Sequence, residues 1–141
     1  MLKKLTFLTI IILAFLQSYS QQQVNYRLAR PEKVQYGTAS YYADKFVGRK
    51  TANGEIFSQE KMTCAHNTLP LGTWIKVTNL RNKKSVIVRV NDRLHPKNPR
   101  LVDLSKTAAK KLGYTGHGLT KVKVEVLSKN DPELLALMAS K

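Results

Sequence analysis

Three carboxylates in this 141-residue chain lie in settings where a side chain could do chemistry. Glu55 directly follows the turn-forming residues 51–54, Asp92 ends an apolar run, and Asp103 is enclosed by apolar neighbours. Partial desolvation at the end of a buried strand raises the pKa of a carboxyl group towards working pH, which makes it a candidate acid or base.

Each of these residues also has a structural interpretation. Asp92 could equally be a turn former whose side chain bonds backbone amides. Asp103 lies two residues before Ser105 and could satisfy loop or helix amides, which we favour over a catalytic role from the residues alone. We expect the other six carboxylates of the chain to be surface groups, with Asp131 as a helix cap.

The remaining reactive residue types exclude several classes of enzyme. His66, His95 and His117 lack the spacing of metal ligands, so we expect no metal and no other cofactor. There is no serine-hydrolase elbow and no glycine-rich phosphate loop. Cys64 is the only cysteine, so no intramolecular disulfide can form, and we interpret it as a small buried hydrophobe.

The elements that must position these residues are mostly short strands. The pattern predicts strands at 35–42, 62–65, 73–79, 85–91, 101–104 and 120–127. The apolar run 85–91 predicts a strand buried on both faces. Ser105 can cap a helix that Gly113 ends, and Asp131 with Pro132 can start a C-terminal helical turn. Many short strands with little helix indicate a small, mostly β barrel.

The first twenty residues have the pattern of a secretory signal peptide. A pair of lysines precedes the apolar run 5–16, and Ser18 and Ser20 provide a cleavage site before Gln21. A run of about 12 residues is too short to span a bilayer, so we expect no transmembrane segment. No lipobox cysteine lies near the cleavage site, and we expect export through the secretory pathway to the periplasm or the cell exterior.

We therefore divide the chain into a signal peptide (1–20), a linker (21–34), a barrel domain (35–128) and a C-terminal tail (129–141). The chain has 24 Lys and Arg against 9 Asp and Glu, and without residues 1–20 its formal net charge is +13. Such a surface attracts polyanions, which outside a cell include the cell wall, unless the charge serves only solubility. The basic residues are scattered, so we do not expect nucleic acid as a partner.

Residues 36–127 carry several ordered motifs that resemble the rare-lipoprotein-A family of septal-ring, endolytic peptidoglycan transglycosylases. The motifs are GTASYYA (37–43), GRKTANGE (48–55), TCAH (63–66), TLPLGT (68–73), VTNL (77–80), SVIVRVNDR (85–93) and LVDLS (101–105). The resemblance implies a six-stranded double-psi β-barrel with one or two short helices. This agrees with the strand pattern.

The resemblance also implies an activity, namely lytic transglycosylation of peptidoglycan glycan strands that are poor in stem peptides. In this reaction the C6 hydroxyl of N-acetylmuramic acid attacks its own C1 and leaves a 1,6-anhydro end, so one carboxyl group that donates and then accepts a proton suffices. Glu55, His66 and Asp92 match the family's functional residues. We assign the proton transfers to Asp92, charge stabilisation or sugar positioning to Glu55, and orientation or protonation of a carboxylate to His66.

Four further residues are candidates for substrate binding. Asn91 and Arg93 flank Asp92 in its motif, and Asp103 matches a family motif that also resembles an acidic residue of plant expansin barrels. Tyr42 could stack on a sugar face or belong to the core. The chain departs from the family after Arg93, where it reads Leu-His-Pro instead of Gly-Pro-Phe.

Two other functions stay open at this stage. One is a non-catalytic, expansin-like module that binds wall glycans, and the other is a secreted protein-binding barrel, because fold alone does not settle function. The joint presence of Glu55, His66 and Asp92 favours the enzyme. We expect a monomer, with any divisome or cell-wall partner unidentified.

Overall fold

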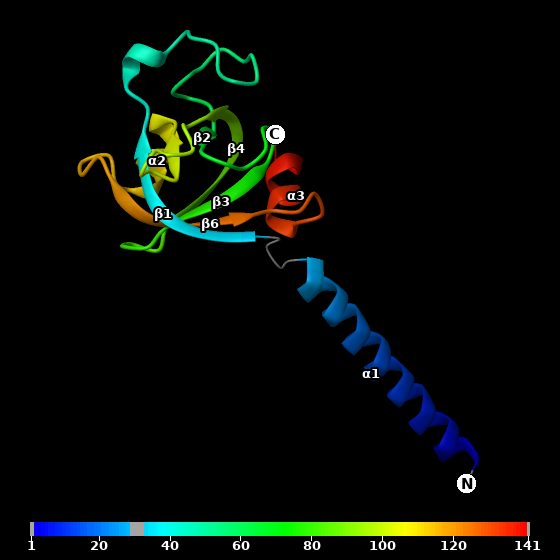
Figure 1. The fold of residues 1–141 in the computed structure, drawn as a ribbon. Helices are drawn as coiled ribbons and strands as arrows, with labels where there is room; N and C mark the ends of the chain where they lie inside the picture. Colours follow the sequence, from blue (N-terminus) through cyan, green and yellow to red (C-terminus); the bar gives the residue numbers. More distant parts are fainter. Residues whose placement is uncertain (1, 29–32, 141) are drawn as a thin grey trace. The chain divides into compact units, whose positions relative to one another are not determined.

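The computed structural model describes residues 2–28 and 33–140, and six strands within them form a barrel (Figure 1). The strands are β1 (Lys33–Tyr41), β2 (Thr63–His66), β3 (Trp74–Asn79), β4 (Ser85–Arg93), β5 (Val102–Leu104) and β6 (Thr120–Val126). The helices are α1 (Leu2–Leu28), α2 (Lys106–Leu112) and α3 (Pro132–Ala139), with a 3-10 turn at Asp44–Phe46. The predicted fold class, mainly β with six barrel strands, is confirmed.

The barrel closes in the order β1-β5-β2-β4-β3-β6. Two neighbouring pairs, β1 with β5 and β2 with β4, run parallel, and the other pairs run antiparallel. Gly37 permits the close approach of β1 to the segment entering β5, because a Cβ at this position would lie 2.6 Å from Cβ of Leu101. Only glycine fits such a crossing without a backbone shift.

Valines from several strands fill the interior, among them Val77, Val88 and Val124, none of which is exposed. The prediction that β4 is buried on both faces is wrong. Its side chains alternate, with Ile87 and Arg89 only half-buried. A closed barrel of six strands has one interior, so alternate side chains of this strand point away from it and stay partly exposed.

The predicted helix caps are confirmed. Oγ of Ser105 accepts a hydrogen bond from the backbone N–H of Ala108, and Gly113 ends α2 with a left-handed φ of 75°. In the C-terminal helix, Oδ1 of Asp131 accepts from the N–H groups of Glu133 and Leu134. Both devices satisfy N–H or C=O groups that helix ends leave free.

The chain divides into two compact units, one of residues 31–128 and one of residues 1–30 with 129–141. α1 continues to Leu28, through part of the segment that the sequence analysis assigned to a linker. The rest of that linker up to residue 32 lies outside the described residues, and β1 begins at Lys33. Among the described residues, no helix combines the length and the apolar character needed to cross a membrane.

Candidate active site

The candidate site is built on an irregularity near the C-terminal end of β4. The register of β4 against β2 shifts there, which leaves Asn91 as an extra residue. A β-bulge of this kind re-aims side chains and is frequent beside active sites. Two consecutive side chains consequently reach the same loop, because Asn91 Nδ2 donates to Glu55 (3.2 Å) and Asp92 Oδ1 accepts from the N–H of Ala52 (2.9 Å).

Asp92 is held by three donors. Its Oδ2 accepts from the hydroxyl of Tyr42 at 2.5 Å, and its Oδ1 accepts from the N–H groups of Ala52 and Arg93, both at 2.9 Å. The residue itself is half-buried. The carboxyl group is therefore fixed in orientation but remains within reach of solvent.

Glu55 lies in a tighter clamp. Arg89 binds it in bidentate fashion, at 2.7 Å to Oε1 and 2.9 Å to Oε2. Asn53 Nδ2 donates to Oε1 at 2.7 Å, and Asn91 adds the fourth contact. The hydrogen bond from Arg89 is the main cause that lowers the pKa of Glu55 from 4.5 to about 2, against the opposing effect of burial. Glu55 is therefore ionised at neutral pH.

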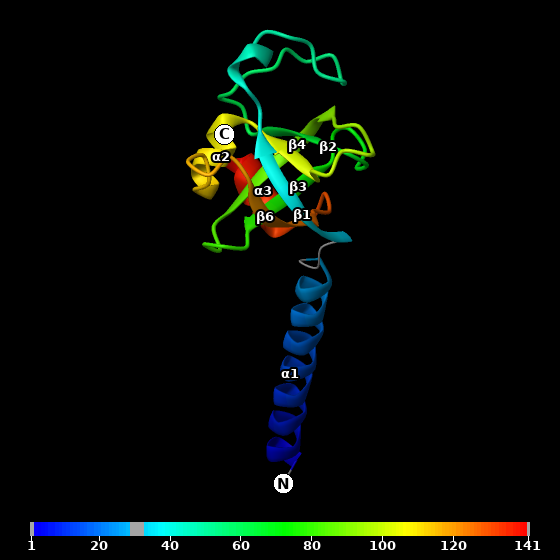
Figure 2. The ribbon, with the colours of Figure 1, turned by 60° about the vertical axis from the view of Figure 1, so that its left-hand side comes forward.

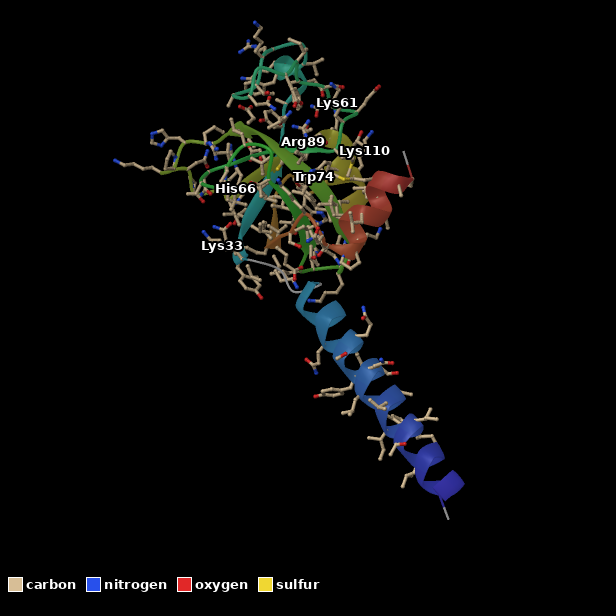
Figure 3. The ribbon with its side chains drawn as sticks, turned by 90° about the vertical axis from the view of Figure 1, so that its right-hand side faces the viewer. Lys33, Lys61, His66, Trp74, Arg89 and Lys110 are labelled. Atoms are coloured by element: carbon tan, nitrogen blue, oxygen red, sulfur yellow. The ribbon has the colours of Figure 1, made fainter. Side chains whose placement is uncertain are left out.

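One loop carries the contacts to both carboxylates. Residues 43–62 extend beyond one end of the barrel (Figures 1 and 2), and in Figure 3 Arg89 lies at that end while Lys33 lies towards the other. Gly54 turns the loop with a φ of 87°, and the N–H of Thr51 donates to the carbonyl of Glu55. The N–H of Asn53 donates to the carbonyl of Asn91 at 3.2 Å, which docks the turn on the bulge.

His66 ends β2 and is completely buried. Its Nδ1 accepts from the N–H groups of Thr68 and Leu69, both at 3.1 Å, and its Nε2 has no partner. Burial, aided by the charges of Arg93 and Lys33, lowers its pKa from 6.5 to about 4, so the ring is neutral at pH 7. Within the described residues it makes no hydrogen bond to Glu55 or Asp92. Its contacts organise the loop after β2.

Some polar groups of the predicted substrate-binding residues already bind other groups of the protein. Nη1 of Arg93 donates to the carbonyls of His66 (3.0 Å) and Leu69 (2.6 Å), which ties β4 to the loop after β2. Asn91 has a buried Oδ1 without a partner. The structure thus places Asn91 within the Glu55 clamp, and Arg93 beside Asp92 with one nitrogen committed to backbone oxygens.

Asp103 and Tyr42 also have internal partners. Both oxygens of Asp103 are bound by Arg100, at 2.9 and 3.1 Å, and the residue is 8% exposed. The ring of Tyr42 packs against Phe57 with centroids 4.3 Å apart. Asp103 lies outside the hydrogen-bonded network of the described residues that joins Asp92 to Glu55, whereas Tyr42 is part of it.

Burial raises the pKa of the Cys64 thiol well above its usual range, which fits its interpretation as a buried hydrophobe. Among residues 2–28 and 33–140, no three His, Cys, Asp or Glu side chains gather as a metal site. A cavity of about 350 Å³ lies elsewhere, lined by Asn79, Arg81, Asn82, Gly113, Tyr114, His117, Leu119 and Thr120. None of the predicted site residues lines that cavity.

The sequence analysis missed Arg89 and Asn53. Arg89 is the only charged residue among the strand positions 85–91, and a lone arginine in an apolar strand is a usable sign of a partly buried ion pair. Asn53 was interpreted only as a turn former, although its amide also reaches Glu55. With these two residues, the site offers an anchored carboxylate beside a second carboxyl group that could transfer protons.

Comparison with known proteins places these residues in a family. Residues 34–124 match the family described as lytic transglycolase. The endolytic peptidoglycan transglycosylase RlpA of Pseudomonas aeruginosa (strain UCBPP-PA14) is 58% identical over 89 residues, which are 63% of this chain and 26% of that protein. The protein of the same name from Vibrio cholerae is 42% identical over 118 residues, 82% of this chain and 45% of that protein. The chain thus spans less than half the length of these relatives.

Two solved structures share the fold. The Streptomyces papain inhibitor has a TM-score of 0.56 and 20% identity, covering 70% of this chain and 97% of that one. The expansin of Clavibacter michiganensis has a TM-score of 0.54 and 20% identity, covering 69% and 52%. These likenesses show the barrel fold alone. The match to the family across residues 34–124, together with the relatives above, shows that this chain belongs to the lytic transglycolase family and is related to the rare-lipoprotein-A proteins.

Proposed function

We propose that the barrel is an endolytic peptidoglycan lytic transglycosylase. It would cleave the β-1,4 bond from N-acetylmuramic acid to N-acetylglucosamine and leave 1,6-anhydro ends during cell-wall remodelling. The observation that carries this proposal is the pair of carboxylates Glu55 and Asp92. They have different hydrogen-bond partners, but one loop contains Glu55 and binds Asp92. The names of the curated relatives support it.

Asp92 carries the proton transfers in this proposal. It donates a proton to the glycosidic oxygen as the bond from C1 to that oxygen breaks. The resulting carboxylate then accepts the proton of the C6 hydroxyl as O6 bonds to C1. The carboxyl group ends as it began and water is not consumed, because the attacking group belongs to the same sugar.

Glu55 cannot supply the proton at neutral pH, because its pKa of about 2 leaves it ionised. Its proposed role is to stabilise positive charge that develops at the anomeric carbon, or to position the sugar. Arg89 neutralises part of the negative charge of Glu55, so we assign Glu55 the smaller share of the catalysis. His66, neutral and bonded to backbone amides, supports the loop after β2 and acts on the site only through it.

We also place the protein outside the cytoplasm, in the periplasm or the extracellular space. The proposal rests on the charged and apolar pattern of residues 1–20 and on the basic character of the chain. Cleavage before Gln21 is checked by N-terminal sequencing of protein recovered from the producing cells. A mature chain that still begins with residues 1–20 would contradict it.

The activity is tested by mass spectrometry of products from purified sacculi. We expect anhydro ends from the wild type and a fall of about 10²–10⁴-fold for Asp92→Asn, the usual contribution of general acid–base catalysis. Asp103→Asn is the matched control, since it breaks the ion pair with Arg100 and should lower the melting temperature while activity per folded molecule is kept. Reducing ends would indicate a hydrolase, and binding without products would favour a glycan-binding module. A folded, inactive Asp103→Asn would contradict the assignment of Asp92.

A further inference from the structure

Tyr42 provides the only side-chain donor to Asp92 among the described residues. Its hydroxyl lies 2.5 Å from Oδ2, whereas Oδ1 receives two backbone N–H groups. Because two donors already occupy Oδ1, a proton carried by Asp92 resides on Oδ2. Tyr42 therefore contacts the oxygen from which a proton would be transferred.

The phenol is held in place by its neighbours. Phe57 packs against the ring at 4.3 Å between centroids, and Phe46 meets it edge-on at 5.8 Å. The carbonyl of Tyr42 accepts from Gln59 Nε2 at 2.8 Å, and its N–H donates to the carbonyl of Leu104. With one ring face covered and the hydroxyl engaged, Tyr42 is poorly placed to stack on a sugar.

The phenol of Tyr42 stays protonated at neutral pH. Burial raises the pKa of its phenol far above the ordinary value of 10.0, and the hydrogen bond and charge of Asp92 raise it further. Cys64 on β2 and Asp103 on β5 face the same phenol and act in the same direction. The hydroxyl can therefore donate its hydrogen to the carboxylate that forms when Asp92 has given up its proton.

We propose that Tyr42 is a positioning residue of the transglycosylation reaction, whose hydroxyl aims the Asp92 carboxyl group and stabilises its ionised form. This inference rests on the proposed function for its catalytic consequence, but the contact itself does not depend on activity. It gives Tyr42 a role other than the direct sugar binding expected from the sequence.

The test is Tyr42→Phe, which keeps the ring and removes the hydroxyl. We expect kcat to fall about 10- to 100-fold, the scale of one hydrogen bond to a charged group, with KM within about twofold. The ionised form of Asp92 loses a donor, so the alkaline limb of the pH–rate profile, where the general acid loses its proton, should move to higher pH by about one unit.

Tyr41→Phe is the matched control. The hydroxyl of Tyr41 donates to the carbonyl of Thr115 at 3.0 Å and its ring meets Tyr114, so this variant also loses one partly buried phenol hydrogen bond. We expect a lower melting temperature but an unchanged kcat and pH profile. Equal losses of kcat in both variants would mean that Tyr42 acts only through stability, which would overturn the proposal.

A measurement that does not depend on catalysis separates the role of Tyr42 from the proposed transglycosylase function. In ¹³C NMR titrations, the midpoint of the Asp92 carboxyl signal should move to higher pH in Tyr42→Phe and stay in place in Tyr41→Phe. If wild-type protein gives no anhydro products while this midpoint moves, the proposed function fails and the contact survives. An unmoved midpoint, a normal kcat, or a raised KM alone would overturn the role of Tyr42.

Discussion

The clamp around Glu55 predicts a specific pH dependence of stability. Glu55→Gln keeps the shape of the side chain but removes the negative charge that Arg89 binds through two nitrogens. Folding lowers the pKa of Glu55 from 4.5 to about 2. The ionised form therefore contributes stability that is fully present above pH 4.5 and is lost as the pH falls through about 2.

The magnitude follows from the same pKa values. A pKa difference of this size corresponds to at most about 3 kcal/mol at neutral pH. The Glu55 side chain is 30% exposed, so solvent screens part of the interaction, and we expect about 1–2 kcal/mol. For a barrel of about 100 residues this lowers the melting temperature by roughly 5–10 °C.

The assay is urea unfolding of wild type and Glu55→Gln at intervals from pH 7 to pH 2. The difference between them should be largest at neutral pH and should disappear near pH 2. Glu60→Gln, at an exposed position close in the chain, is the control and should match the wild type throughout. If Glu55→Gln equals the wild type at pH 7, or the two curves run parallel down to pH 2, the clamp does not hold Glu55 in the way described.

Two further predictions concern His66 and the basic surface. Folding lowers the pKa of His66 from 6.5 to about 4, so the free energy of unfolding of the wild type should fall by up to about 3 kcal/mol as the pH drops from 6.5 to 4. Urea unfolding of His66→Gln should lack this fall. Equal pH dependence of the two proteins would show that the ring is not held neutral. In pull-down assays, binding to sacculi should weaken as the salt concentration rises, because attraction between exposed charges is screened over about 8 Å at physiological ionic strength. Binding that does not change with salt would mean that the net positive charge does not contribute to binding the wall.

The features that the sequence predicted well are local. The cap at Ser105, the end of α2 at Gly113 and the placement of Asp92 on a strand end each depend on a few consecutive residues. The pattern of many short strands with little helix also indicated a barrel. These elements needed no knowledge of which strands pair.

The features that it missed depend on contacts between distant residues. Arg89 and Glu55 are 34 positions apart, and the shift that frees Asn91 exists only in the pairing of β4 with β2. Periodicity alone could not show that the outer face of β4 is partly exposed. The same apolar run would be expected of a strand in a sheet that is covered on both faces. The burial of His66 likewise follows from barrel closure and not from its neighbours in sequence.

The turn at residues 51–55 makes the two carboxylates interdependent. The N–H of Ala52 binds Asp92, the N–H of Asn53 docks on the bulge at Asn91, and Glu55 closes the turn in the grip of Arg89. We therefore expect loss of the Glu55 charge to loosen the segment that orients Asp92, in addition to removing a negative charge from the site. Substitutions at Glu55 and Asp92 should consequently be non-additive, because residues that share one network are coupled. Lost activity in Glu55→Gln alone is thus no measure of what the Glu55 carboxylate does at the anomeric carbon.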